Sequence, residues 1–378
     1  MTLPARLIQS VRPHASPGVM AGAAVVAATF AATPFLLPDL STRLDMDIGA
    51  TGFLSTAQVG SFAVSTFLAG RLLRPRRRLH YGSLGLIAVA TAASALMTVF
   101  PLLLVTRVVA GLGMGTLTWI AWADATRSPR GMGDIAAIAP VTATIASPIL
   151  GWIIGAGGYP WVFGSLAAMA AIATLAPVDF GDLPRIGRNV SGSRSNRLLL
   201  AGLLVLSVGG SSVFIFTGAA AEAVHDLSPV AVSWALSLNA ICGVIATRRT
   251  ATRGTAAVWI VLTAASAIAV GVIASPVVFF VALAVWGFAF WMAIPEVLRM
   301  LTERSLTPSE RMGDAQAAMA VGRVFGPVVG AFALGVGLFT RLSIVGATLM
   351  TCAAAVVGGV ELYRVGSTSR ETEVSRER

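Results

Sequence analysis

The sequence predicts an all-α membrane protein with twelve transmembrane helices in two six-helix halves. Three observations lead to this prediction: the composition of the 378-residue chain, the number of long apolar segments, and the uneven distribution of its charges. Of all residues 56% are hydrophobic and 12% are charged, and the mean hydropathy is +0.82. Soluble globular chains carry about 25% charged residues. The composition therefore excludes a disordered chain, a disulfide scaffold and almost any water-soluble enzyme.

Twelve apolar segments follow one another, each close to the roughly 20 residues that cross a bilayer as a helix. Six precede a polar, Gly- and Ser-rich stretch over 179–197, which is typical of a flexible linker, and six follow it. We therefore divide the chain into an N-terminal half over 1–178, this cytoplasmic linker, a C-terminal half over 198–363, and a charged tail over 364–378 that is expected to be disordered. The first segment is too long for the apolar region of a signal peptide. The expected spans are Pro17–Leu40, Thr51–Leu73, Tyr81–Phe100, Pro101–Trp122, Gly133–Ile154, Trp161–Pro177, Leu198–Ala221, Pro229–Ala246, Ala256–Ile273, Pro276–Glu296, Ala315–Phe339 and Leu342–Tyr363.

All 27 basic residues are arginines, and their positions predict the topology. An even number of spans places both termini on the same side of the membrane. Twenty-three arginines then share that side, whereas Arg43 and Arg341 fall on the other side, and Arg107 and Arg323 fall inside spans. The positive-inside rule places both termini and the linker in the cytoplasm, and we expect a bacterial inner membrane. The net charge of +10 therefore indicates orientation in a bilayer and not a nucleic-acid partner.

The two halves contain corresponding sequence patterns. Span four ends with WIAWAD at 119–124, and span ten ends with WMAIPE at 291–296. Both read Trp-x-Ala-x-x-acid. Span five carries SPILG at 147–151, and span eleven carries GPVVG at 326–330. Because the matches occur in the same order at corresponding spans, we expect a parallel duplication of six helices, an arrangement that builds transporters with a site between the halves.

Three short segments resemble the motifs of a known protein family, and one loop differs from that family's pattern. Residues 107–115 (RVVAGLGMG) place small residues at turn spacing after an arginine, 147–151 contains the Pro-x-x-Gly pattern, and 158–163 reads GYPWVF. These resemble the fourth-helix motif, the antiporter-associated fifth-helix motif and the start of the sixth helix in the major facilitator superfamily. The resemblance covers nearly the whole chain and implies that superfamily's fold. The loop over 70–78 (GRLLRPRRR) departs from the family, because a basic residue stands at the position of the Asp that helps to lock the cytoplasmic gate.

Two arginines lie inside predicted spans, Arg107 in the fourth and Arg323 in the eleventh. An ionised side chain within a membrane costs at least about 2.5–3.5 kcal/mol, so each is expected to face a cavity or a polar partner. Gln316 lies seven residues before Arg323 and shares its helix face. The resemblance gives Arg107 the alternative role of holding carbonyl groups of a neighbouring helix. The expected substrate-binding lining comprises Arg107, Arg323, Gln316, Gln58, Met114 and Thr118.

Carboxylates are the candidates for gating and proton coupling, because a membrane-buried acid can load and release a proton. Asp39 and Glu222 end spans one and seven on the outer side, and Asp124 and Glu296 end spans four and ten on the inner side. The hypothesis for Asp124 and Glu296 is that they pair with the basic loops and form the inner gate. The alternative for all four acids is a solvated helix end. The gating and coupling set is Asp124, Glu296, Asp39, Arg74 and Arg77.

Glycines and prolines recur at turn spacing in spans four, five and eleven. Glycines four residues apart let helices approach closely, and a proline kinks a helix. Pro148 and Pro327 stand at matching depths of spans five and eleven, where we expect the halves to rock. The helix-packing set is Gly111, Gly115, Pro148, Gly151, Gly326, Pro327 and Gly330.

The leading functional prediction is a secondary active transporter that moves a small organic solute by alternating access. Proton-coupled export of drug-like or endogenous metabolites is favoured by the span-five motif. The alternative is a carrier for organic anions or carboxylates, favoured by two intramembrane arginines without a midplane acid to balance them, because guanidinium binds carboxylate bidentately. A membrane scaffold or sensor is a third class, which the presence of a central cavity would oppose.

Nothing in the sequence supports an enzyme. The chain has no Lys, so the phosphate-binding Gly-x-x-x-x-Gly-Lys-Ser/Thr loop is absent, and no nucleophile–base set lies in the spans. His225, beside Glu222 and Asp226, is expected in an ordinary solvated loop after span seven. We therefore expect no cofactor and no metal. The expected partners are a small-molecule substrate, the lipid bilayer and protons, without nucleic acid, and the protein is expected to be a monomer.

Overall fold

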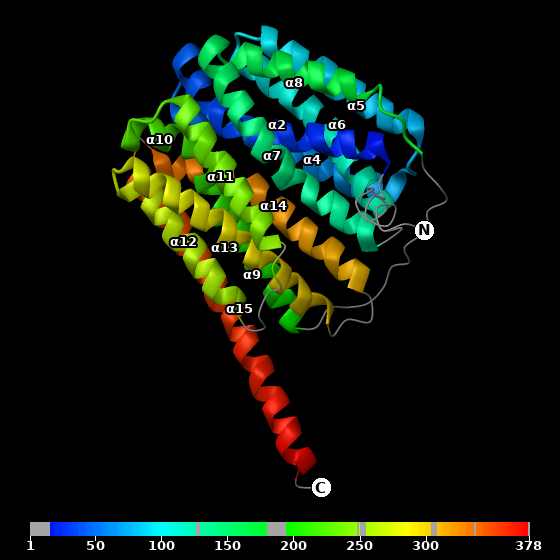
Figure 1. Ribbon diagram of the computed structural model, residues 1–378, viewed down its shortest axis with the longest axis vertical. Coiled ribbons are helices and arrows are strands. Elements are labelled where there is room, and N and C mark those ends of the chain that lie inside the picture. The colour runs from blue at the N-terminus through cyan, green and yellow to red at the C-terminus, as the bar shows by residue number, and fades with distance from the viewer. Residues whose placement is uncertain are drawn as a thin grey trace, which may run out of the picture.

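The computed structural model describes residues 16–125, 129–179, 194–247, 249, 255–303, 308–335 and 338–376. Within these ranges the chain is helical, with short connections and without strands. Figure 1 shows these helices packed side by side in two bundles. The N-bundle contains α2 (Pro17–Arg43), α3 (Ile48–Thr51), α4 (Phe53–Leu72), α5 (Arg77–Leu96), α6 (Phe100–Ala125), α7 (Pro129–Gly157) and α8 (Tyr159–Ala173). The C-bundle contains α9 (Arg194–Phe214), α10 (Thr217–His225), α11 (Pro229–Thr247), α12 (Ala256–Val272), α13 (Pro276–Thr302), α14 (Pro308–Leu334) and α15 (Phe339–Arg376).

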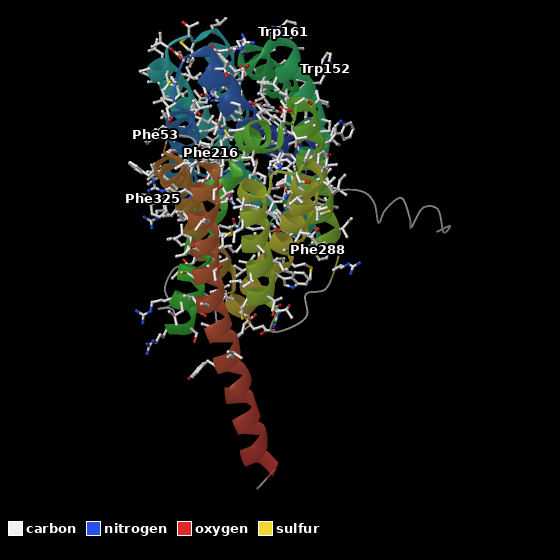
Figure 2. All side chains as sticks on the ribbon, turned by 90° about the vertical axis from the view of Figure 1, so that its left-hand side faces the viewer. Phe53, Trp152, Trp161, Phe216, Phe288 and Phe325 are labelled. Atoms are coloured by element: carbon white, nitrogen blue, oxygen red, sulfur yellow. The ribbon has the colours of Figure 1, made fainter. Side chains whose placement is uncertain are left out.

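The described helices confirm the predicted twelve spans in two halves. Ten segments are long and apolar enough to cross a membrane, with α3 and α4 counted together as Ile48–Leu72. The shorter apolar helices α8 and α12 occupy the sixth and ninth places. Exposed aromatic side chains project from the bundle surface, as Figure 2 shows for Phe53, Trp152, Trp161 and Phe325. Such a surface fits hydrocarbon, because apolar side chains lose nothing by facing lipid.

Local signals position several helix starts. Ser16 caps α2, where its hydroxyl accepts a hydrogen bond from the N–H of Val19 at 3.4 Å. Asp47 caps α3 through the N–H groups of Gly49 and Ala50 at 2.8 and 3.3 Å. Proline stands in the first turn of α2, α8 and α13, where its missing N–H costs nothing. The cap at Ser16 and the first-turn prolines explain why the predicted starts Pro17 and Pro276 agree with the observed ones.

Two predicted elements differ in the structure. Span seven, expected as one helix over 198–221, is broken between α9 and α10, where the N–H of Phe216 donates to the carbonyl of Val213 at 3.0 Å in a tighter turn. The expectation that the tail over 364–378 is disordered is also wrong for its described part, since α15 continues to Arg376. Charges of opposite sign three residues apart in the sequence, as at Arg370 and Glu373, favour such an extension.

The bundles touch through a small set of helix pairs: α2 with α10, α3 and α4 with α14, and α7 with α11. We call the end that carries α10 and the connections 44–47, 97–99 and 273–275 the α10 end, and the opposite end the linker end. In Figure 1 the bundles lie together near α10 and diverge towards the ends that carry the two termini. Close backbone approaches between them, such as Gly218 on the carbonyl of Pro34 and Gly49 on that of Ala331, lie at the α10 end.

Glycines set the tightest contacts inside each bundle. In the N-bundle, α6 packs on α4 where Gly111 faces Ser61 and Gly115 faces the carbonyl of Phe62. In the C-bundle, α14 packs on α9 where Gly326 faces Ser211 and Gly330 faces the carbonyl of Ser212. A side chain at any of these positions would overlap the facing helix, so the absence of Cβ sets the distance between the helices.

We predict that Gly326→Ala destabilises the protein, whereas Gly155→Ala does not. A Cβ at position 326 would meet Ser211 and the carbonyl of Val208, and such overpacking costs about 1–3 kcal/mol. At Gly155 no atom lies within 4 Å of an added Cβ, so alanine is tolerated there. Thermal unfolding of both purified variants in detergent measures the difference. Equal unfolding temperatures for the two variants would contradict the packing role of Gly326.

Candidate functional site

Arg323 and Gln316 lie on a solvent-accessible face of α14 that points away from the lipid surface. Phe325 and Phe332 are 56% and 74% exposed on the face that meets lipid. Arg323 and Gln316 are also exposed, yet at 3.6 residues per turn Arg323 points about 180° away from Phe332. On either side of Arg323, α14 contacts α9 through Gly326 and α4 of the other bundle through Val324. The guanidinium therefore reaches solvent between the two bundles.

Arg107 does not share this space. Its side chain is fully buried inside the N-bundle, where Nη2 donates to the carbonyl of Ala90 at 3.3 Å and to the hydroxyl of Ser94 at 2.5 Å. Nη1 donates to Gln58 at 3.4 Å, and the guanidinium lies over the ring of Phe163, 4.5 Å from its centroid. The prediction that Arg107 lines a cavity is therefore corrected in favour of the alternative. It joins α4, α5 and α8 to α6, because the close packing of α6 on α4 leaves no opening on this side.

The other predicted lining residues divide in the same way. Gln58 and Met114 are 5% and 0% exposed, and both belong to the interior of the N-bundle. Met114 packs among Phe62, Leu84 and Ile87 in an apolar cluster. Thr118, one turn further along α6, is half-buried. Of the six residues expected to line one cavity, the structure thus places Arg323 and Gln316 together on an accessible wall and puts Arg107, Gln58 and Met114 elsewhere.

Glu296 is fully buried at the linker end of α13 and is not a solvated helix end. It forms an ion pair with Arg299 on the next turn, and Arg299 also pairs with Glu303. Asp124, its counterpart in the repeat, is 6% exposed at the end of α6. Both acids therefore lie inside protein where the sequence suggested a helix end, and the buried position makes each charge sensitive to its surroundings.

Glu361 is a buried acid that the sequence reasoning passed over. It lies near the linker end of the α15 span, and its two carboxylate oxygens accept the N–H groups of Ala256 and Ala257 at 2.9 and 3.4 Å. It thereby caps the start of α12, whose first N–H groups have no partner within their own helix. The signal that could have revealed it is an acidic residue inside a predicted span, two positions before the predicted end at Tyr363.

The basic loop after α4 contributes little to packing. Arg74 and Arg77 are exposed, and Arg77 pairs with Asp179 at 3.0 Å while both side chains remain largely in solvent. Exposed pairs of this kind contribute about 0–1 kcal/mol. Residues 248, 250–254 and 304–307 lie outside the described residues, as does the side chain of Arg130. The proposed pairing of Asp124 and Glu296 with those loops therefore stays a prediction.

Two contacts between the bundles are built on carbonyl groups that prolines leave free. Pro148 in α7 has no N–H to offer the carbonyl of Thr144, and Ser237 of α11 donates its hydroxyl to that oxygen at 2.7 Å. Pro38 in α2 likewise frees the carbonyl of Pro34, on which Gly218 of α10 packs. Beside the first contact, Gly151 packs against Ser233. Pro148 and Gly151, expected to act in packing, thus lie at the joint between the bundles.

Pro327 occupies the matching place in α14. It frees the carbonyl of Arg323, so the residue that points between the bundles also carries a backbone acceptor without its helical N–H. The repeat therefore places a proline-freed carbonyl near the middle of both α7 and α14. In both halves this helix contacts the other bundle, α7 through α11 and α14 through α4.

A pocket of about 160 Å³ lies between the bundles at the α10 end. Asp39 of α2 lines it and accepts the N–H of Tyr159 at 2.7 Å and Nε of Arg43 at 3.0 Å. Glu222 of α10 lines it from the other bundle. Asp39, expected to act in gating, therefore ties the end of α2 to the start of α8.

His225 lies at the end of α10 and is buried, so the expectation of a solvated loop is wrong for this residue. Its ring nitrogens lie 2.7 Å from the carbonyl of Val270 and 3.0 Å from that of Ser275, and its ring packs on Phe279. These contacts anchor α10 to the α12–α13 connection. Across the described residues no group of three His, Cys, Asp or Glu side chains could hold a metal ion.

The comparisons with known proteins agree with this architecture. The family model described as Major Facilitator Superfamily matches residues 19–331. A chloramphenicol resistance protein of Streptomyces lividans is 28% identical over 330 residues, which are 79% of this chain and 84% of that protein. A multidrug resistance protein B homolog of Mycobacterium tuberculosis is 33% identical over 151 residues, 37% of this chain and 26% of that protein, so the chain spans about a quarter of its length.

Solved structures of transporters share the fold. A bacterial homolog of the human lysosomal transporter Spinster, in an inward-facing and unoccupied conformation, has a TM-score of 0.67 at 13% identity, with 91% of this chain and 96% of that chain covered. The human organic anion transporter MFSD10 has a TM-score of 0.64 at 16% identity, with 90% and 98% covered. At these identities the similarity concerns the fold alone.

We predict that Arg107 acts in stability, whereas Arg323 does not. A hydrogen bond to a charged group contributes about 1.5–3 kcal/mol, so Arg107→Ala, which removes several, is expected to lower the free energy of unfolding by about 3 kcal/mol. Arg323→Ala, at an exposed position, is expected to change it by less than about 0.5 kcal/mol. Unfolding of both variants in detergent provides the measurement. An equally large loss with Arg323→Ala would show that this side chain is held by packing.

We also predict that Ser237→Ala weakens the joint between the bundles. The loss of one hydrogen bond of about 0.5–1.5 kcal/mol shifts the ratio of joined to separated bundles about twofold to tenfold. Distances between spin labels at Thr98 and Ala274, one in each bundle at the α10 end, report this ratio. Ser266→Ala is the matched control, because its hydroxyl bonds the carbonyl of Leu262 in its own helix at 2.9 Å. A shift as large in the control would argue against the joint.

Proposed function

The chain belongs to the Major Facilitator Superfamily, whose members are transporters and not enzymes, and we propose that it exports small drug-like or endogenous organic solutes by alternating access. The observation that carries this proposal is the similarity along 79% of the chain to a chloramphenicol resistance protein. The partial match to a multidrug resistance protein points in the same direction. A small neutral drug-like molecule is accordingly the first substrate class to test.

We propose that the linker end faces the cytoplasm of a bacterial cell and that the protein works as a monomer in the inner membrane. The support is the arginine asymmetry, because 23 of the 27 arginines fall on that side. In this orientation the bundles are joined at the outer side and diverge at the inner side, so the described conformation is inward-facing. Arg323 and Gln316 are then reached by a solute from the cytoplasm.

We propose that protons supply the energy. The sequence contains no Lys and hence no P-loop, so nucleotide hydrolysis at such a loop is excluded as the source. The span-five Pro-x-x-Gly segment, whose freed carbonyl joins the two bundles, resembles the motif associated with antiporters. Asp124 and Glu296 are the proposed inner-gate acids, supported by their burial at equivalent places of the repeat.

A carrier for organic anions is the second candidate, and one observation favours it. Arg323 is accessible between the bundles, and Gln316 offers a hydrogen-bonding amide two turns away on the same face. The nearest acid of α14 in sequence, Asp314, points about 180° away from Arg323 around the helix. A guanidinium binds a carboxylate by two parallel hydrogen bonds, so this wall suits an acidic solute.

Transport into proteoliposomes with an imposed pH gradient tests both candidates. We predict proton-driven movement of chloramphenicol that persists in Arg323→Ala, because a neutral solute needs no guanidinium. If a carboxylate-bearing solute is moved instead, Arg323→Ala is expected to reduce its rate at least about tenfold, the effect of losing one charge-assisted contact. Arg341→Ala, an exposed arginine at the start of α15, is the matched control. Failure of all three solute classes, neutral, anionic and cationic, under every gradient would contradict the proposed function.

A further inference from the structure

The pocket at the α10 end brings one carboxyl group from each bundle towards the other. Asp39 lies near the end of α2, and Glu222 lies in α10, one turn after Gly218. Gly218 is the residue that packs on the carbonyl of Pro34. Because Gly218 and Glu222 are four residues apart, they share one face of α10. The close approach of α10 to α2 therefore places Glu222 and Asp39 on the lining of the same pocket.

The two acids differ in their surroundings. Asp39 accepts hydrogen bonds from the N–H of Tyr159 and from Arg43, which offset its negative charge. The guanidinium of Arg43 lies over Gly158, at the junction of α7 and α8. The positive charge that pairs with Asp39 is thus engaged within the N-bundle, beside Gly158.

The remaining elements that pack on α10 bring no further charge to Glu222. The segments α11 and α12 contain no Asp, Glu, Arg or His, and the first such residue of α13 is Glu296 at the linker end. In α10 itself, His225 is buried against the carbonyls of Val270 and Ser275. Asp226, which ends α10, is exposed and adds only negative charge.

The pKa of Glu222 responds to this arrangement. The Glu222 side chain keeps contact with solvent, yet desolvation beside the pocket raises the pKa of its carboxyl above the ordinary value, and the negative charge of Asp39 raises it further. Separation of the bundles would remove Asp39 from the neighbourhood of Glu222 and relieve the remaining desolvation, so the pKa of Glu222 would fall towards the ordinary value. A group whose pKa is higher in the joined state stabilises that state at low pH and loses the effect as the pH rises through the raised pKa.

We propose that Glu222 and Asp39 form a pH-sensitive latch at the α10 end, in which a protonated Glu222 lets the bundles stay joined and an ionised Glu222 drives them apart. The bundles are joined when Glu222 is neutral, because the carboxyl then approaches Asp39 without repulsion. When both groups are charged, repulsion across the pocket favours separation. With the orientation of the proposed function, on which this meaning rests, acid outside the cell closes the outer side and shifts the protein to the inward-facing state.

Distances between the bundles measured at different pH values test the latch. Spin labels at Thr98→Cys and Ala274→Cys, in a Cys242→Ser and Cys352→Ser background, lie in connections of opposite bundles at the α10 end. Pulsed electron paramagnetic resonance is recorded without any solute between about pH 8 and about pH 5. We expect the joined fraction to rise as the pH falls, with a change in the joined-to-separated ratio of about tenfold for each pH unit by which the two pKa values of Glu222 differ.

Three variants make the test specific. Glu222→Gln is expected to stay joined at every pH, because its side chain is neutral throughout. Glu222→Arg, which replaces repulsion by attraction to Asp39, is expected to do the same. Asp226→Asn, which removes the exposed neighbouring acid, is expected to keep the pH response of the parent protein. A parent protein without a pH response, or a Glu222→Gln protein that retains it, overturns the latch.

The experiments distinguish a failure of the latch from a failure of the proposed export function. The distance measurement uses no solute, so its outcome does not depend on what the protein carries. Proteoliposomes that move no solute while the distances still follow pH through Glu222 would contradict export and leave the latch in place. Solute export with distances that ignore Glu222 would overturn the latch alone.

Discussion

A proline inside a membrane helix leaves one carbonyl without its helical N–H, and in hydrocarbon that oxygen must be satisfied by protein. Two of the contacts between the two bundles lie at such carbonyls. The carbonyl of Thr144, freed by Pro148, receives the hydroxyl of Ser237 from the other bundle. Gly218 packs closely against the carbonyl of Pro34, which Pro38 leaves without its helical N–H. Both contacts are small and local, and either can be exchanged for water when the bundles part. A joint made this way holds without fixing the two halves permanently.

The cost of a charge in the membrane explains the contrast between the two intramembrane arginines. Arg107 is buried and offsets part of the cost through Ala90, Ser94 and the face of Phe163, while its Nε is buried without a hydrogen-bond partner among the described residues. Arg323 is exposed on the face of α14 that lies between the bundles. The same residue type thus stabilises in one half and is accessible in the other. The two halves have similar helix arrangements, but their intramembrane arginines stand at different positions, so one is buried within its bundle and the other is accessible between the bundles.

Much of the architecture follows from the sequence because the membrane restricts it so strongly. Apolar length gave the twelve spans, and the caps at Ser16 and Pro276 fixed several boundaries within a residue. The break between α9 and α10 was missed, because the tight turn at Phe216 lies within a continuous apolar segment and has no hydropathy signal. The burial of His225 was missed for a similar reason, since its carbonyl partners lie in a connection some 50 residues later in the chain. The prediction of a polar cavity lining around Arg107 was wrong, because helical spacing shows which residues share a helix face but not which helix packs against that face.

By itself the sequence predicted that this protein lies in a membrane and crosses it with twelve helical spans. These properties depend on composition and on order along the chain, because a hydrocarbon layer about 30 Å thick sets the length and the apolar character of each span. Only the tertiary structure decided which intramembrane arginine is accessible, which carboxyl groups approach each other and where the two bundles meet. Those properties depend on the rotation and pairing of helices that are far apart in sequence, and side-chain packing sets that pairing.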